Sequence, residues 1–262
     1  MRIATWNVNS LKARLPRVEE FLGYADVDVL CLQETKLADK SFPALTFNTH
    51  GYDTVHYGQG QWNGVAILSR VGIEAPSHGF RDPHVDPYEG DARILGATCG
   101  GVRVISVYVP NGREVGTEFY ERKLHWLGVL HDWISSEYEP SDPLIVCGDF
   151  NVAPADRDVW DPKAFVGATH VTEPERKAVE HLGEWGLADL FRKVWPDQDR
   201  LYTYWDYRAG DFHQHRGMRI DLALGTKPVA DRVSWAAVDR NARKGTGPSD
   251  HAPLIIDLSD PA

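Results

Sequence analysis

The sequence predicts an α/β fold in which two packed β-sheets carry helices on their outer faces. The chain has 262 residues, of which 42% are hydrophobic, and can therefore bury a sizeable core. Strand-like and helix-like segments alternate along it, and hairpins are mixed with helical crossovers. Its Pro- and Gly-rich stretches are short, with no long linker or repeat. We therefore expect a single domain spanning residues 1–262.

The first half of the chain begins with the short strand Arg2–Trp6. A helical region over 11–24 follows, and Pro16 is expected to interrupt it because proline lacks the N–H that a helix interior uses. Further strands are predicted at Asp28–Leu32, Tyr52–His56, Gly64–Ser69 and Ile73–Ser77. A hairpin is predicted from Arg93–Cys99 and Val102–Val109, which are joined by two glycines. The longest helix is predicted over Thr117–Tyr138, with Thr117 as its N-cap.

The second half begins with the apolar strand Leu144–Cys147, which Gly148 is expected to end. A helix is predicted over Pro174–Trp185, because Thr172 and Glu175 have the spacing of a capping box. Later strands are predicted at Leu201–Trp205, Arg219–Leu224, Arg232–Val238 and Leu254–Leu258.

Several classes of protein are excluded by composition. No apolar run reaches the roughly 20 residues of a membrane span, and the N-terminus lacks the apolar stretch of a signal peptide. Cys31, Cys99 and Cys147 are odd in number, far apart and mostly within apolar runs. They are typical of reduced core thiols rather than disulfides or a zinc site. We therefore expect a cytoplasmic protein.

The charge is distributed unevenly. The whole chain carries −10, but residues 200–244 contain nine Arg or Lys and five Asp, a balance of +4 that leaves −14 elsewhere. Aromatic residues are interleaved with these cations: Tyr202, Tyr204, Trp205, Tyr207, Phe212 and Trp235. Basic and aromatic residues together suit a polyanion with stackable bases, although a solvated surface loop explains the composition equally well.

Polar side chains follow many of the predicted strands. One example is LIVCGDFNVAP at 144–154, where a predicted buried strand is followed by Asp149 and Asn151. Similar groups occur in five other segments, at 6–9, 33–36, 108–112, 219–221 and 248–253. Each has an ordinary explanation as a cap, a turn or a satisfied core residue. Together they indicate an active site, because catalytic groups gather at strand ends.

Six motifs carry a resemblance to a known family: WNVNS, LQETK, YVPNG, GDFN, RIDLAL and SDHAP. In this order they resemble the exodeoxyribonuclease III family of abasic-site (AP) endonucleases, within the larger endonuclease/exonuclease/phosphatase group. The resemblance covers roughly Ile3 to Asp257. It implies a DNase I-like fold, that is, a four-layer α/β sandwich with the site at one end of two facing sheets.

The resemblance also implies a function. The expected protein is a DNA repair phosphodiesterase, active as a 3′-to-5′ exonuclease, AP endonuclease and 3′-phosphatase on double-stranded DNA with abasic sites or damaged 3′ ends. It is expected to depend on Mg²⁺ or Mn²⁺ and to act as a monomer, at the nucleoid when DNA is bound. Mg²⁺ prefers oxygen ligands, which a few carboxylates supply.

The residues that match the family motifs divide into two groups. The metal ligands implied are Glu34, Asn7 and Asp250, with Asp149, Asn151 and His251 as further possibilities. For catalysis, Asp149 should take or orient the proton of the attacking water and Asn151 should help to hold that water. Tyr108 should donate to the phosphate or leaving oxygen. His251 should contact a non-bridging oxygen, with Asp221 fixing its other nitrogen.

Other residues are expected to contact DNA. Asn111 should reach a phosphate, and an aromatic and apolar wall should receive an abasic sugar. This wall comprises Tyr204, Met218 and Ile220. The family often has Phe or Trp where Tyr204 stands, so this position keeps an aromatic ring but gains a polar tip. Met218 and Ile220 are apolar but not bulky aromatics, so the pocket here is expected to be roomier. Charge and loop position alone suggest four contacts to the DNA backbone, namely Arg208, Arg216, Arg243 and Lys244.

Two alternatives remain open at this level. One is a phosphatase or phosphodiesterase of the same fold acting on RNA, an inositol phosphate or a sphingolipid. The other is an inactive relative that only binds DNA. The full set of candidate catalytic groups argues against a mere binding protein, and the basic, aromatic segment at 200–244 argues for DNA.

Overall fold

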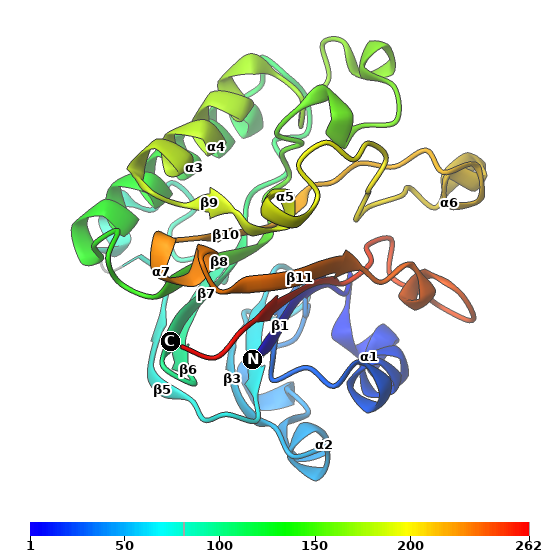
Figure 1. Cartoon of the computed structure of the whole chain (residues 1–262). Helices are drawn as coiled ribbons and strands as arrows, with labels where there is room; N and C mark the ends of the chain where they lie inside the picture. Colours follow the sequence, from blue (N-terminus) through cyan, green and yellow to red (C-terminus); the bar gives the residue numbers. More distant parts are fainter. Residues whose placement is uncertain (81, 262) are drawn as a thin grey trace.

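The computed structural model describes residues 1–80 and 82–261 of the chain. In that part of the chain, two six-stranded sheets face one another and helices cover their outer sides (Figure 1). The predicted four-layer α/β sandwich is therefore confirmed. None of the helices in the described residues has both the length and the apolar character needed to cross a membrane.

The first sheet contains both ends of the chain. Its strands lie in the order β11-β12-β1-β2-β4-β3. Their bounds are β1 Arg2–Asn7, β2 Val29–Gln33, β3 Asp53–Tyr57, β4 Val65–Ser69, β11 Val233–Val238 and β12 Leu254–Leu258. Strands β1 and β2 are parallel, whereas β12 pairs antiparallel with both β1 and β11.

The second sheet has the order β5-β6-β7-β8-β10-β9. Its strands are β5 Glu74–His78, β6 Ile94–Cys99, β7 Val102–Tyr108, β8 Leu144–Asp149, β9 Ala188–Asp189 and β10 Asp221–Gly225. The predicted hairpin is confirmed as β6 and β7, while β7 and β8 are parallel. Both sheets are therefore mixed, as expected.

The helices lie mainly outside the two sheets. Their bounds are α1 Leu11–Ala25, α2 Ala44–Thr49, α3 Glu118–Glu137, α4 Glu173–Trp185, α5 Leu190–Val194, α6 Asp211–Gln214 and α7 Lys227–Ala230. Short 3₁₀ helices occur at Asp39–Ser41, Pro83–Val85, Asp156–Asp158, Pro162–Phe165, Arg208–Gly210 and Arg240–Arg243. Helices α1 and α2 cover the first sheet, and α3 and α4 cover the second (Figure 1).

Alternation along the strands separates the core into layers. In β2, Val29 and Cys31 face the second sheet, whereas Leu30 and Leu32 pack beneath α1. This follows from the two-residue period of a strand, which sends successive side chains to opposite faces. The three cysteines are buried, and within the described residues they form no disulfide, which agrees with the sequence-based expectation.

Most predicted elements agree with the observed bounds to within two residues, but four specific expectations differ. Strand β8 continues through Gly148 to Asp149, since Gly148 pairs with both Val107 and Leu222. The predicted strand Leu201–Trp205 is wrong. Tyr204 makes isolated β-bridges, and the backbone groups of Thr203 and Trp205 bond to loop residues.

Helices α1 and α3 show the other differences. Helix α1 is continuous through Pro16, whose ring is on the exposed side, so the proline removes one hydrogen bond without ending the helix. Thr117 occupies the N-cap position of α3, but its hydroxyl donates backward to Glu114 O instead of capping. The capping box of α4 is present as predicted.

Candidate active site

Polar residues from both sheets meet at one end of the sandwich, where central strands stop. Asn7 ends β1 opposite Gln33, the last residue of the parallel strand β2, and Glu34 follows directly. In the second sheet, Tyr108 ends β7 opposite Asp149, which ends the parallel strand β8. The parallel pairing within each sheet therefore brings these side chains to a shared edge.

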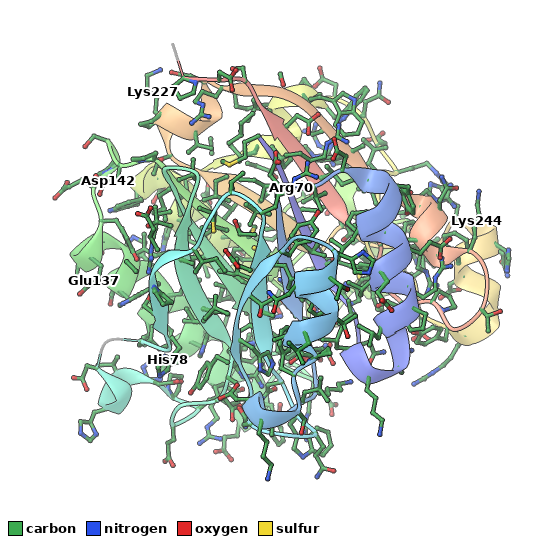
Figure 2. All side chains as sticks on the ribbon, turned by 90° about the horizontal axis from the view of Figure 1, so that it is seen from below. Arg70, His78, Glu137, Asp142, Lys227 and Lys244 are labelled. Atoms are coloured by element: carbon green, nitrogen blue, oxygen red, sulfur yellow. The ribbon has the colours of Figure 1, made fainter. Side chains whose placement is uncertain are left out.

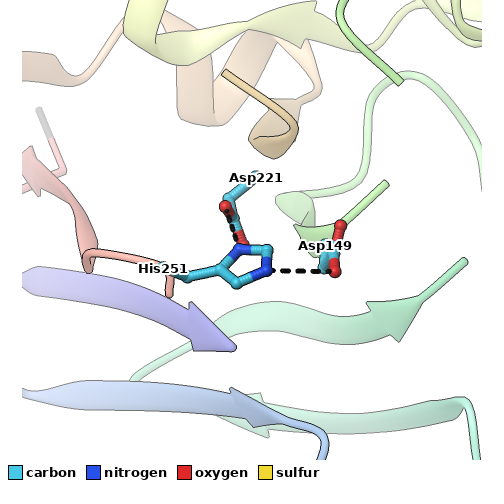
Figure 3. Close-up of side chains that lie close together, drawn as sticks. All are labelled: Asp149, Asp221 and His251. Carbon is cyan, nitrogen blue, oxygen red and sulfur yellow. Dashed lines mark hydrogen bonds and ion pairs between the residues drawn. The ribbon is translucent and has the colours of Figure 1, made fainter. Parts of the chain in front are cut away.

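Asp149, Asp221 and His251 form the buried centre of this edge (Figure 3). Asp221 begins β10, which runs antiparallel to β8, so its Cα is paired with that of Asp149. The ring nitrogen His251 Nδ1 lies 2.8 Å from Asp221 Oδ2, and Nε2 lies 3.8 Å from Asp149 Oδ2. None of the three is more than 4% exposed. The imidazole is thus held between two carboxylates.

The charges in this group are strongly coupled. Burial alone would lower the pKa of His251, but the Asp221 and Asp149 carboxylates outweigh it and raise the pKa to about 10. Burial raises the pKa of Asp149 to about 7; Asp221 adds to this rise, whereas His251 opposes it. The imidazole is therefore a cation at neutral pH, and Asp149 can exchange a proton near neutrality.

Asn7 joins the carboxylates of the two sheets. Its Nδ2 donates to Glu34 Oε1 and to Asp149 Oδ2, each at 2.8 Å, while its Oδ1 accepts from the backbone N of Asn9 at 2.9 Å. The amide nitrogen, not the oxygen, therefore faces the site. In this orientation Asn7 donates to both carboxylates. Its oxygen keeps a second lone pair, so the metal-ligand role of Asn7 stays a prediction.

Glu34 and Asp250 are connected through two residues that the sequence reasoning missed. Lys36 Nζ lies 2.8 Å from Glu34 Oε2 and donates to Asn9 Oδ1 at 2.6 Å, and Asn9 Nδ2 donates to Asp250 Oδ1 at 3.1 Å. Burial would raise the pKa of Glu34, but Lys36 and the Asn7 amide outweigh it and hold the pKa below its ordinary value. Glu34 is therefore ionised at neutral pH.

The donor set suits a hard divalent cation. Carboxylate oxygens of Glu34, Asp149, Asp221 and Asp250 are present, and Mg²⁺ and Mn²⁺ prefer such ligands. Asp221 Oδ1 is buried and has no hydrogen-bond partner within the described residues, so it is an uncompensated oxygen in the same group. His251 is the third member of the buried group with Asp149 and Asp221, and its Nδ1 is already bonded to Asp221.

Two asparagines lie beside Asp149 on separate loops. Asn151 N donates to Asp149 Oδ1 at 2.9 Å, and Asn151 Nδ2 donates to Val109 O at 2.9 Å. Asn111 Nδ2 donates to Asn151 Oδ1 at 3.1 Å. Both side-chain amides are therefore fixed in orientation next to the carboxylate.

Tyr108 remains a phenol at neutral pH. Burial of the ring, followed by the nearby charge of Glu34, raises the pKa of its hydroxyl well above the ordinary value. The guanidinium of Arg93 lies 4.9 Å from the ring centroid and donates to Tyr108 O at 3.2 Å. Tyr108 is thus held in place as a hydrogen-bond donor.

The predicted wall for an extruded sugar is assembled on one side of His251. Met218 and Ile220 are buried in one cluster, and Tyr204 packs against it. The Tyr204 ring centroid is 5.0 Å from that of His251. A cavity of about 160 Å³ beside Tyr204 is also lined by Trp160, Phe165, Arg216, Gly217 and Met218.

The four cations predicted to contact DNA differ in accessibility. Arg208 is highly exposed and Lys244 is exposed, whereas Arg216 is half-buried and pairs with Asp211 at 2.6 Å. Arg243 is buried and donates to Ser249 O and to Trp205 O, the latter at 3.2 Å. The prediction that Arg243 contacts DNA is therefore wrong, because its guanidinium is used inside the protein.

A hollow of about 360 Å³ is lined in part by Tyr108 and Asn111. Cationic and aromatic side chains line it, among them Arg93, Arg113, Trp62, Tyr88 and Phe119. The sequence reasoning missed this surface, because its residues are spread over 59–119 and form no cluster in the chain.

Sequence reasoning also assigned no role in the site to Lys123 and Glu175, which lie behind the side-chain amides of Asn111 and Asn151. Both are fully buried and paired with one another. Lys123 lies in the apolar stripe of α3 with Tyr120, Leu127 and Leu130. A lysine at such a core position could have indicated a special role.

Comparison with known proteins places these features among nucleases. Residues 4–251 match the endonuclease/exonuclease/phosphatase family. Exodeoxyribonuclease III of Haemophilus influenzae is 31% identical over 97% of this chain and 98% of its own length. An AP endonuclease structure from Archaeoglobus fulgidus is 35% identical, with a TM-score of 0.95 over 99% of this chain and 100% of that one. A variant of the 3′ phosphatase NExo from Neisseria, bound to a product DNA hairpin, is 37% identical, with a TM-score of 0.94 and the same coverage.

Proposed function

The chain belongs to the endonuclease/exonuclease/phosphatase family, and from this premise we propose its substrate and mechanism. It is a hydrolase of the exodeoxyribonuclease III and AP endonuclease type. We propose that it repairs double-stranded DNA by hydrolysing phosphate esters at abasic sites and at damaged 3′ ends. In this proposal the chain acts as one domain and as a monomer, on nucleoid DNA in the cytoplasm.

One observation carries the proposal. The buried group of Asp149, Asp221 and His251 lies beside Glu34 at the shared end of both sheets, and Asn7 connects Glu34 to Asp149. In this proposal the group supplies a proton acceptor, a cationic donor and cation-binding carboxylates around one position. Hydrolysis of a phosphodiester needs these three functions together.

Asp149 is proposed as the general base. Its pKa of about 7 lets the ionised form accept a proton from water near neutral pH. Asn151 N donates to Asp149 Oδ1, which leaves Oδ2 toward His251 and the site. One N–H of Asn151 Nδ2 is used by Val109 O, and the other is proposed to orient the attacking water.

His251 and Tyr108 are proposed to donate to the phosphate. Asp221 fixes Nδ1 of His251, so the cationic ring presents Nε2–H to a non-bridging oxygen, where negative charge grows during the reaction. The Tyr108 hydroxyl, which stays protonated, donates to the phosphate or to the leaving oxygen. Asn111 is proposed to hold a DNA phosphate.

Glu34 is the proposed first ligand of Mg²⁺ or Mn²⁺, with Asp250 and Asp149 as the other carboxylates in reach. When bound, the ion neutralises phosphate charge and lowers the pKa of water. Lys36 and Asn9 hold the ionised Glu34 and the Asp250 carboxylate in position for this purpose.

DNA is proposed to bind across the end of the sandwich. Arg208 and Lys244 are exposed in the basic, aromatic segment. The hollow lined by Arg93, Arg113 and Trp62 also includes Tyr108 and Asn111 in its lining. Cations together with stacking rings suit the backbone and bases of a DNA strand. The cavity beside Tyr204 is proposed to receive an abasic sugar.

The test is a side-by-side assay of three duplexes with an abasic site, a recessed 3′ end or a 3′-phosphate, each with Mg²⁺ and with EDTA. Metal-dependent release of product from at least one duplex is expected. An RNA strand and an inositol phosphate serve as comparison substrates. Faster turnover of either would replace DNA as the substrate, and DNA binding without hydrolysis would make the chain a binding protein.

A further inference from the structure

A lysine and a glutamate form a fully buried ion pair behind the two site amides. Lys123 on α3 and Glu175 in the first turn of α4 are both 0% exposed, and Lys123 Nζ donates to Glu175 Oε1. A buried ion pair is weak support for stability, because apolar residues of similar size often replace such pairs without loss. The other hydrogen bonds of Lys123 and Glu175 therefore indicate the role of the pair.

The lysine connects the two loops that carry the site amides. Lys123 Nζ donates to Asn151 O at 2.6 Å and lies 3.3 Å from Asn111 O. Asn151 follows β8 and Asn111 follows β7, so these contacts join the ends of two neighbouring strands. An ammonium group offers three N–H donors, enough to bond Glu175 and the two loop carbonyls together.

The backbone of Asn151 has a left-handed conformation that its hydrogen bonds fix. Its φ is 51°, in a region that asparagine enters more readily than most residues with a side chain. Two donors fix its carbonyl: Lys123 Nζ and His170 Nδ1, the latter at 2.6 Å. Burial, followed by the charge of Lys123, lowers the pKa of His170 to about 4, so this ring donates as a neutral imidazole.

Glu175 holds the lysine while it caps α4. Its Oε1 also accepts from Thr169 Oγ1 at 2.6 Å and from His170 N at 2.9 Å, and its Oε2 accepts from Thr172 N and Oγ1. The lysine stem packs against the loop as well, because a Cβ added at Gly112 would meet Lys123 Cδ at 2.8 Å. The ammonium group therefore has a fixed position.

We propose that Lys123, held by Glu175, is a positioning residue that fixes Asn151 for catalysis. It contacts the Asn151 carbonyl and acts through the side-chain amide on the same residue, without touching substrate. Asn111 shares this support and bonds Asn151 Oδ1. The inference rests on the proposed function, since it assigns a role within the same site.

The test removes both charges together, as K123M/E175Q. Methionine keeps the length of the lysine stem, and glutamine keeps an acceptor for the α4 cap. We expect the variant to fold, with a melting temperature within a few degrees of wild type and a DNA Kd within about 2-fold. Its single-turnover rate should fall at least about 10-fold, since a misplacement near 1 Å can cost about 10²-fold. An unchanged rate would overturn the proposal.

The matched control is K177M/E173Q. Lys177 and Glu173 both lie on α4, the helix that carries Glu175. Their Nζ and Oε1 atoms are 2.7 Å apart, but both side chains are exposed. The rate and DNA affinity of this control variant should equal those of the wild type. A loss as large as that of K123M/E175Q would mean that disturbing α4 is sufficient, and the positioning role would fail.

A double-mutant cycle separates positioning from general destabilisation. When Asn151→Ala already removes the amide, adding K123M/E175Q should cost at most about 3-fold more, because the lysine no longer has an amide to place. A further loss of about 10-fold would show that Lys123 acts elsewhere and would overturn the proposal.

A second readout does not require turnover. With selective ¹⁵N-asparagine labelling, the side-chain amide signals of Asn111 and Asn151 should shift or broaden in K123M/E175Q but not in K177M/E173Q. Unchanged signals would contradict positioning. If the wild type cleaves none of the DNA substrates, the proposed function fails, while these signals still decide whether Lys123 positions Asn151.

Discussion

His251 Nδ1 lies 2.8 Å from Asp221 Oδ2, and this contact sets both the orientation and the charge of the imidazole. Because Nδ1 is committed to Asp221, Nε2 is the nitrogen turned toward Asp149. The carboxylates also keep the ring protonated far above its ordinary titration range. His251 is therefore suited to donate a hydrogen bond at neutral pH rather than to accept one.

Asp221→Asn should lower the pKa of His251. Asp221 is the strongest of the groups that raise this pKa to about 10, and an amide carries no charge to stabilise the imidazolium. The measurement is an NMR titration of the His251 ring in metal-free wild type and variant. A titration midpoint that stays in place would show that Asp221 does not set the charge.

The same contact predicts how stability depends on pH. A histidine whose folded pKa is raised contributes stability that is complete below its unfolded pKa of about 6.5 and is lost as pH rises through about 10. The difference in unfolding free energy between wild type and Asp221→Asn should therefore shrink across this window. Urea unfolding at pH 6 and pH 10 measures it; a difference that grows with pH would contradict the assignment.

Asp149→Asn should retain DNA binding and lose most hydrolysis. The amide is nearly isosteric but cannot accept the proton of water, and loss of a general base typically slows a reaction about 10²–10⁴-fold. Single-turnover rates and DNA Kd should be measured on the same preparation. A decrease of only a few-fold would remove Asp149 from this role.

Glu34→Gln should raise the Mg²⁺ concentration that gives half-maximal rate, because a neutral amide is a poorer ligand for a hard cation. Glu173→Gln supplies the control, since Glu173 is an exposed carboxylate on α4 and its loss should leave the Mg²⁺ titration unchanged. Superimposable Mg²⁺ titrations of Glu34→Gln and wild type would make Glu34 a structural residue.

DNA affinity should fall as salt rises despite the net charge of −10, because binding to phosphates releases counterions locally. The double variant R208A/K244A should reduce the slope of log K against log salt by about 2, or about 1 for each phosphate that the variant no longer neutralises. Lys227→Ala is the control, since Lys227 and Lys244 lie at opposite ends of the molecule (Figure 2). Equal slopes in all three proteins would place the phosphate-binding residues elsewhere.

Tyr204→Ala should slow incision at abasic sites more than removal of a 3′-phosphate. An abasic residue enters the pocket without the few kcal/mol that unstacking a base costs, and the Tyr204 ring supplies packing area against Met218 and the sugar. Phosphate removal depends mainly on the Asp149–His251 group. Both rates should be measured as ratios to wild type, and equal losses would end the pocket assignment.

The positions of most strands along the chain and of the polar residues at their ends were predictable from the sequence. The apolar runs before Glu34 and Asp149 mark buried strands, and strand ends in a parallel pair must share an edge. Strand Leu254–Leu258 is predicted to the residue. These features can be predicted from the local sequence, because strands and turns depend on the spacing of apolar side chains and on the residues that favour turns.

Contacts between distant segments were not predictable in the same way. The Asn7 amide is oriented by the backbone of Asn9, which no composition or motif reveals. Arg243 was expected at the surface because cations usually lie there, but carbonyls of the 205 and 249 loops surround it. The partners of Lys123 were not predictable either, since Asn151 is 28 residues away and Glu175 is 52 residues away.

The pairing of the first strand with the last has a consequence for synthesis on the ribosome. Strand β12 lies between β1 and β11, with Ala4 paired to Ile255, so one side of β1 has no neighbour until residues 254–258 have emerged. His251 reaches Asp149 only at the same late stage. A nascent chain therefore exposes an unpaired, apolar strand edge through most of its translation, when it is open to association with other chains. We expect nuclease activity to appear only after translation of this segment, so that an unfinished chain cannot cut DNA.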